Sequence, residues 1–237
     1  MRSFNLNILI FIFSILFSKS NFIEYVYDVE IKGLSLITGN VGKCNFKIYD
    51  ITDEKQEMKI ITKTTNLANF LYPYKDEIKL IVDSKFSLLS INQKISNSKK
   101  RLNIFVDKID KKIFRNDKQL NFYSDTLFSP YSLIHYLKQK TIKINEEYNY
   151  NIFDNRKIEN INLKVTKTED IKVPYGKYNC FHIQPFHKKN LIKNDGKIEL
   201  WFTNDEDKIP LKIILETKIG TFILKLKEIK SKWKVSY

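Results

Sequence analysis

Residues 196–226, GKIELWFTNDEDKIPLKIILETKIGTFILKL, decide the fold class because apolar side chains alternate with other residues along three successive runs. The alternating positions are Ile198, Leu200 and Phe202, then Leu211, Ile213 and Leu215, then Phe222, Leu224 and Leu226. A polar loop at 204–207 and a glycine turn at 218–220 separate the runs. Alternation at period two indicates strands with one buried face. Short strands joined by such turns form an antiparallel meander.

The same period extends over most of the chain. Further strands are expected at 23–31, 42–51, 57–66, 78–82, 89–95, 102–106, 112–115, 148–152 and 161–165. Two segments differ: residues 66–72 predict a short helical turn stopped by Pro73, and Ser129-Pro130 predicts the start of a helix to Gln139. The pattern therefore predicts a mainly β protein. Its core is a single antiparallel, strongly curved sheet or open barrel of about 10–13 strands with one covering helix.

The first twenty residues predict export. Arg2 precedes an apolar run of about a dozen residues, and Ser18-Lys19-Ser20 offers small residues at the cleavage positions. We expect a signal peptide at 1–20 and a single β-barrel-like domain at 21–237 in the periplasm, with outer-membrane association as a further possibility. An uncleaved membrane anchor is the alternative, although the run is shorter than the roughly 20 residues that span a bilayer.

The basic composition does not predict nucleic-acid binding. The formal net charge is +14, but only four of the 41 basic residues are arginines, and the lysines are spread along the chain. Base and phosphate recognition favours the bidentate arginine fork. An exported chain would also meet little nucleic acid, so we expect no nucleic-acid partner. A weak, salt-sensitive attraction to an anionic membrane surface remains a prediction.

Catalytic and metal-binding patterns are absent from the sequence. It contains no nucleophile-elbow, zinc-protease, phosphate-loop or dinucleotide motif, so we expect no enzyme activity, no catalytic residues, no cofactor and no metal. Cys180 and His182 share a strand face, but nothing in the sequence supplies an orienting partner. Cys44 lies on the apolar face of its strand and Cys180 on the opposite face of its own, which argues against a disulfide.

Five segments of the C-terminal half resemble an exported bacterial family, domain of unknown function 3108. They are 129–137 (SPYSLIHYL), 172–180 (KVPYGKYNC), 196–202 (GKIELWF), 205–210 (DEDKIP) and 219–222 (IGTF). The second is similar to the family's "vPaGtfdc" segment, and the third to its G-x-x-x-x-W strand. Tyr175 and Lys208 depart from the usual residues. The resemblance implies an envelope location and a β fold, and it assigns no activity.

Three functions are open. The first is a periplasmic or envelope protein that binds a lipid, an acyl chain or another apolar ligand in the concave face of the sheet. For it we predict that Trp201, Tyr136 and Leu137 meet where the helix contacts the sheet and form one wall of a pocket. The second is a non-enzymatic envelope assembly or scaffold protein with a filled core. The third is an integral outer-membrane β-barrel, suggested by the alternation of Trp233, Val235 and Tyr237.

Overall fold

The computed structural model describes residues 21–32, 39–96, 101–116, 118–122, 124–154, 157–186, 198–217 and 220–232. Within these ranges the chain forms one antiparallel sheet of 14 strands and two short helices. The first eight strands are β1 (Phe22–Lys32), β2 (Asn40–Thr52), β3 (Lys55–Thr64), β4 (Lys75–Asp83), β5 (Leu88–Ile95), β6 (Arg101–Asp107), β7 (Lys112–Arg115) and β8 (Lys118–Asn121). The others are β9 (Glu147–Asp154), β10 (Lys157–Val173), β11 (Gly176–Pro185), β12 (Ile198–Thr203), β13 (Pro210–Thr217) and β14 (Gly220–Lys232).

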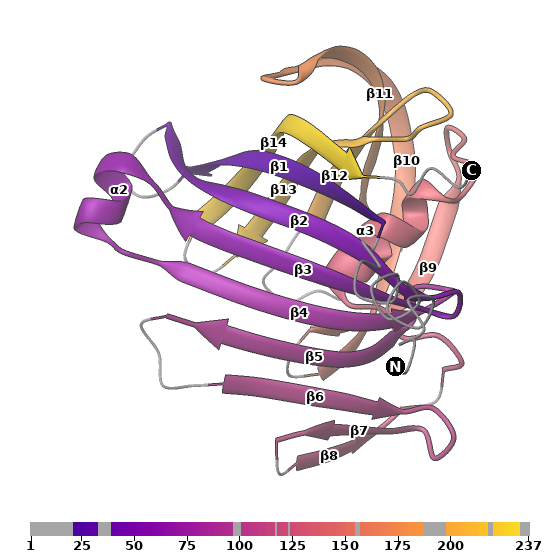
Figure 1. Ribbon diagram of the computed structural model, residues 1–237. Coiled ribbons are helices and arrows are strands. Elements are labelled where there is room, and N and C mark those ends of the chain that lie inside the picture. Colours follow the sequence, from indigo (N-terminus) through magenta and orange to yellow (C-terminus); the bar gives the residue numbers. More distant parts are fainter. Residues whose placement is uncertain are drawn as a thin grey trace, which may run out of the picture.

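The sheet consists of two meanders that meet at the first and last strands. Its order is β8-β7-β6-β5-β4-β3-β2-β1-β14-β13-β12-β11-β10-β9, so β1 and β14 join the two halves. Their register runs from Phe22 opposite Lys232 to Lys32 opposite Thr221, with one bulge at Val26/Tyr27. The sheet curves strongly and does not close, because β8 and β9 are its two ends (Figure 1). The predicted fold class is confirmed, with one strand more than the upper expected number.

Helix α3 (Pro130–Lys138) occupies the concave face of the sheet. Figure 1 shows it behind β1 and β2, between the two halves of the sheet. Ser129 caps it: its Oγ accepts from the Ser132 amide at 3.0 Å, while the Ser129 amide donates to Ser132 Oγ at 3.0 Å. This reciprocal pair satisfies two amides at a buried helix start. The predicted helix is therefore confirmed at both ends.

The concave face and α3 share one apolar core. Leu133, Ile134 and Leu137 of the helix are buried in the same cluster as the inward side chains of the sheet. The Tyr131 ring lies 6.4 Å from the Phe46 ring of β2. These contacts show that α3 packs against the concave face of the curved sheet.

Helix α2 (Asn66–Leu71) forms a short projection between β3 and β4, as the sequence predicts for the segment before Pro73. Among the described residues, neither helix is long and apolar enough to cross a membrane. The expected signal peptide at 1–20, residues 218–219 of the expected glycine turn and the alternation of residues 233–237 lie outside the described residues.

Candidate functional site

Of the two predicted ligand-binding residues of α3, Tyr136 contacts β9 and Leu137 is buried in the core. The Tyr136 ring lies 4.8 Å from the Phe128 ring and 5.6 Å from the Tyr150 ring, and Leu137 is fully buried. Phe128 belongs to the segment before α3, and Tyr150 lies in β9. Tyr136 and Leu137 therefore belong to a packed junction of α3 with one end of the sheet.

Trp201 lies on the other face of the sheet. On β12, Leu200 points to the concave face, because it pairs with Ile213, which is continued by Leu224 and Val29. Successive side chains of a strand point to opposite faces, so Trp201 points outward. The structure thus brings Tyr136 and Leu137 together but separates Trp201 from them. The physical reason is the period of the strand, which places only every second residue against the helix.

Trp201 is nevertheless buried, because polar side chains cover it. Its ring stacks on the His182 ring at 4.2 Å, and Lys212 Nζ lies 4.2 Å from its centroid on the neighbouring strand. Its Nε1–H donates to Glu169 Oε1 at 2.8 Å. His182 Nε2 lies 3.0 Å from Glu199 Oε2. An indole with a satisfied N–H and polar neighbours on each side stabilises the outer face of four strands.

Trp201 is one member of a continuous line of residues across the convex face. The pairing registers of nine strands, from β10 to β4 through β14 and β1, place these residues side by side. In order they are Lys167, His182, Trp201, Lys212, Lys225, Asp28, Lys43, Lys63 and Lys75. We call this line the convex row. Six of its nine members are lysines and one is an acid, so it carries a strong positive charge.

Several lysines of the convex row stand directly opposite each other. Lys212 pairs with Lys225, Lys43 with Lys63, and Lys63 with Lys75. Like charges opposite each other destabilise a sheet unless counter-charges offset them. Lys225 has Glu30 at 2.7 Å, and Lys75 has Glu77 at 2.5 Å.

Other lysines of the convex row are less well compensated. Burial, followed by the charge of Lys225, lowers the pKa of Lys212. Lys43 and Lys63 have no carboxylate within ion-pair distance among the described residues. The end of the row at β2 and β3 therefore carries uncompensated positive charge.

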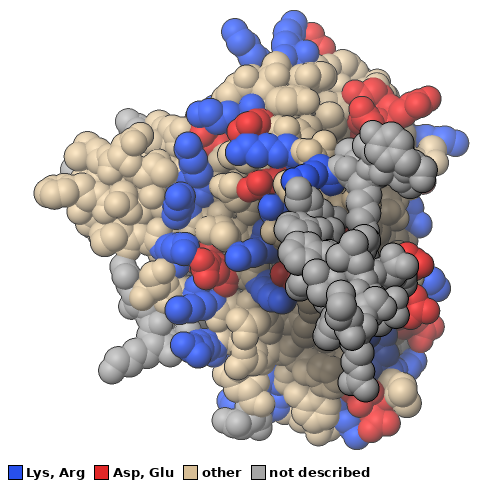
Figure 2. All heavy atoms as spheres, viewed as in Figure 1, with Lys and Arg blue, Asp and Glu red and all other residues tan. Residues whose placement is uncertain are grey.

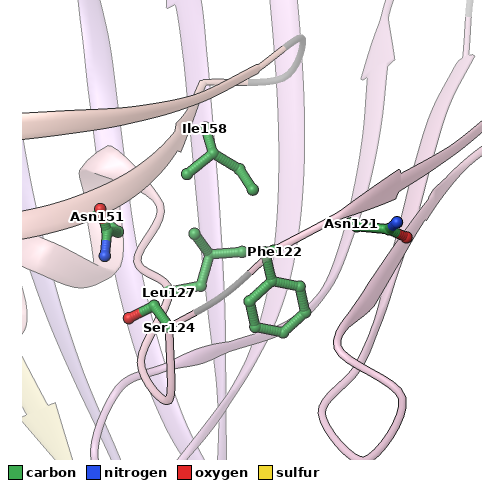
Figure 3. A pocket seen from close by; sticks show the side chains of 6 residues that line it. All are labelled: Asn121, Phe122, Ser124, Leu127, Asn151 and Ile158. Carbon is green, nitrogen blue, oxygen red and sulfur yellow. The ribbon is translucent and has the colours of Figure 1, made fainter.

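A second candidate site is a cavity where the sheet fails to close. It has a volume of about 300 Å³ and lies between β8 and β9 (Figure 3). Its lining residues are three apolar ones, Phe122, Leu127 and Ile158, and three polar ones, Asn121, Ser124 and Asn151. We call this space the seam cavity.

Backbone hydrogen bonds fix one wall of the seam cavity. The Leu88 amide donates to the Leu127 carbonyl at 2.7 Å, and the Phe128 amide donates to the Asn151 carbonyl at 2.9 Å. The segment before α3 thus ties the start of β5 to β9 across the opening. The sequence could not have revealed this cavity, because its walls come from parts of the chain that only the register of both meanders brings together.

The two buried cysteines are protonated at neutral pH, and Cys180 and His182 contact neighbours other than each other. Burial raises the pKa of the Cys44 thiol to about 11 and that of Cys180 to about 12, and both cysteines are free. Cys180 Sγ donates to the Tyr178 carbonyl, while the His182 ring contacts Thr166 and Glu199. The described residues therefore contain no Cys180–His182 pair, and none of their His, Cys, Asp and Glu side chains gather in a group of three that could hold a metal.

Burial also lowers the pKa of His135, the histidine of α3. His135 packs edge-on against Phe86 with ring centroids 4.7 Å apart. Burial, with a smaller contribution from the charge of Lys138, lowers its pKa to about 3. A neutral imidazole in this position acts as a packing residue at neutral pH.

The fold and these sites together define an open, β-barrel-like protein with a helix in its concave face. Its sequence matches the model of a protein family of unknown function, DUF3108, over residues 26–227. The chain belongs to this family, as the C-terminal resemblance predicts, and the match extends well into the N-terminal half. No relative is found among the curated proteins.

The solved structures that match this chain include two that cover most of it. One is a β-barrel-like protein of domain of unknown function DUF1849 from Brucella abortus. It is 11% identical with a TM-score of 0.57, over 90% of this chain and 98% of that one, so the fold is shared. The other is titled a "putative lipoprotein" from Parabacteroides distasonis. It is 13% identical over 88% of this chain and 94% of that one, and its TM-score of 0.31 is too low to indicate a shared fold.

Proposed function

We propose that this chain is an exported, non-enzymatic protein of the cell envelope that acts through its outer surface as an assembly or scaffold module. One observation carries the proposal: the apolar stripe of α3 occupies the concave face, where a lipid carrier of this shape would hold its ligand. Leu133, Ile134 and Leu137 are buried against the sheet. A packed interior leaves the surface as the place where partners bind.

The outer surface supports this function better than an integral barrel. The convex row places lysines side by side at the middle of the sheet exterior. A lysine at the bilayer midplane costs roughly 2–4 kcal/mol in an outer-membrane barrel. A convex face with several such lysines is suited to water and to anionic partners.

The test is lipid analysis of the purified protein. Solvent extraction and mass spectrometry should find no stoichiometric lipid, and titration with fatty acids of increasing length should release no binding heat. One bound lipid per chain would overturn the proposal. For the location, N-terminal sequencing of the exported protein should find a start near Asn21; intact Met1-containing protein confined to the cytosol would contradict export.

The seam cavity favours a second function, the binding of one small, partly apolar molecule. Its volume of about 300 Å³ lies at the lower end for ligand pockets, and Ile158 and Leu127 offer apolar contacts beside polar groups. An Ile158→Trp variant would fill the space. If the protein binds a short-chain fatty acid and Ile158→Trp abolishes the binding, while Leu67→Trp on the exposed helix α2 does not, this second function replaces the first.

A further inference from the structure

The projection formed by α2 is the most apolar exposed part of the described chain. Residues 64–74, TTNLANFLYPY, contain no charged side chain. Leu67 is 71% exposed, Phe70 83% and Tyr72 68%, and Leu71 and Tyr74 are also exposed. Single exposed apolar residues are common, but five in eight positions form a contiguous patch of the kind that marks an interaction site. We call residues 64–74 the apolar tip.

The apolar tip is held in a fixed shape. The Thr64 amide donates to the Tyr74 carbonyl at 3.0 Å, and the Tyr74 amide donates to Thr64 Oγ1 at 2.9 Å, which closes its base. The Thr65 amide donates to the Val41 carbonyl at 3.1 Å, and Ala68 is buried, so α2 is anchored on β2. The large side chains therefore remain exposed because the backbone directs them outward.

Lysines surround the base of the apolar tip. Lys63 directly precedes the tip and Lys75 directly follows it, and Lys43 stands opposite Lys63 on β2. These three lysines form the β2–β4 end of the convex row, in which Lys43 and Lys63 have no paired carboxylate among the described residues while Lys75 pairs with Glu77. Figure 2 shows the tip as a lobe without charged residues and a band of Lys and Arg on the face beside it. The acids beside these lysines already have partners. Asp76 accepts from Gln93, and Glu77 pairs with Lys75. Asp28, which stands opposite Lys43, pairs with Lys227 at 3.3 Å.

We propose that the apolar tip and the lysines at its base form a docking site for an anionic membrane surface. The tip would enter the boundary between headgroups and acyl chains, and Lys43, Lys63 and Lys75 would contact lipid phosphates. Apolar side chains beside a lysine-rich face are the composition of elements that bind at this interface. A convex projection suits a deformable lipid surface, whereas a protein partner would have to provide a matching pocket.

This proposal goes beyond the scaffold function and explains an otherwise unfavourable feature of the sheet. Lys43, Lys63 and Lys75 repel one another across three adjacent strands. Anionic headgroups would supply the counter-charge that Lys43 and Lys63 lack among the described residues. The docking site could be absent from a protein with a packed core, and it could be present in a protein with an unfilled core. The two are independent because the core lies on the concave face of the sheet and the lysines lie on the convex face.

Vesicle sedimentation tests the proposal on the mature protein at low ionic strength. The protein should bind phosphatidylcholine vesicles that contain phosphatidylglycerol, bind those of phosphatidylcholine alone much more weakly, and dissociate as salt rises. The Leu67→Ser/Phe70→Ser double variant should lose at least about tenfold in partitioning. The Ile109→Ser variant is the matched control, because Ile109 is 93% exposed on a different loop, and it should bind like the wild type.

Substitution of the three lysines at the base of the tip tests the electrostatic part of the docking site. Replacing Lys43, Lys63 and Lys75 by Gln should reduce binding to anionic vesicles by about fivefold for each lysine, equivalent to about 1 kcal/mol. The exposed Lys55, Lys85 and Lys118, replaced together, provide the control with the same change in charge. An effect of equal size in both triple variants would refute a defined site and leave only general attraction.

A tryptophan placed at position 70 gives a direct measure of insertion. The emission of the Phe70→Trp variant should shift to shorter wavelength with anionic vesicles and be quenched by lipids brominated on their acyl chains. The proposal fails if the wild type does not bind anionic vesicles, or if the emission at position 70 is unchanged while the protein is bound. It also fails if the tip variants abolish only self-association, measured by ultracentrifugation without lipid, since the tip would then contact a second copy of the chain.

Discussion

Replacing Leu137 by Ala tests whether α3 packs in the concave face as a structural element. The side chain is 0% exposed and belongs to the common core of helix and sheet. A buried Leu→Ala change costs about 2–5 kcal/mol, because it removes burial and leaves a cavity that the neighbours only partly fill. For a domain of this size the melting temperature should fall by roughly 4–20 °C.

Chemical denaturation provides the measurement. The midpoint of urea unfolding should fall while the slope m stays unchanged, since the native state remains equally compact. Leu67→Ala is the matched control: Leu67 also lies in a helix but is 71% exposed, and its replacement should change the free energy of unfolding by no more than about 0.5 kcal/mol. Benzene should raise the stability of Leu137→Ala but leave the wild type unchanged, because a new dry cavity accepts a small apolar molecule.

A cost below about 1 kcal/mol for Leu137→Ala, with m unchanged, would refute this reasoning. It would mean that the concave face is loosely filled and that α3 can move away from the sheet. The same result combined with fatty-acid binding to the wild type would favour the lipid-carrier function predicted from the sequence.

Three further predictions concern the buried polar groups. The pKa of His135 is about 3 in the folded protein and near 6.5 when unfolded, so its contribution to stability is complete above about pH 6.5 and lost as the pH falls toward 3, by up to about 1.4 kcal/mol per pH unit; His135→Leu should flatten that part of the curve of unfolding free energy against pH. Cys44 and Cys180, with pKa values raised to about 11 and about 12, should react with a thiol reagent at pH 8 only after denaturation, and rapid labelling of the native protein would contradict their burial. In a Trp233→Phe background the emission of Trp201 should not respond to fatty acids, and a shift that follows acyl-chain length would restore it as a ligand-binding residue.

The alternation of apolar residues was sufficient to predict most of the strands, and the positions of Pro73 and Ser129-Pro130 indicated the two helices. Strand β8 was missed because its four residues include a single apolar side chain, Leu120, too few to establish a period. The pairing of β1 with β14 was also beyond prediction. It joins segments about 200 residues apart, and neither strand has a local turn that identifies its partner.

The candidate site was predicted less well than the fold, because the prediction placed Trp201 on the wrong face of the sheet. The helix stripe correctly indicates that Tyr136 and Leu137 face the sheet, but the alternation of β12 places Trp201 with Glu199 on the opposite face from Leu200. The convex row requires the register of nine strands, which no single segment contains. The apolar tip could have been noticed in the sequence as eleven residues without charge around a short helix, although its exposure follows only from the way α2 is anchored on β2.

The position of β14 in the middle of the sheet has a consequence for how the chain folds. The last strand of the described chain completes both meanders, because it pairs with β1 on one side and β13 on the other. Until it is available, both neighbours present unpaired edges that can bind other chains. Contacts between such distant segments also make folding slow. The two meanders therefore cannot become one sheet until the C-terminal strand has emerged, and a chain shortened before β14 would be left with two exposed strand edges.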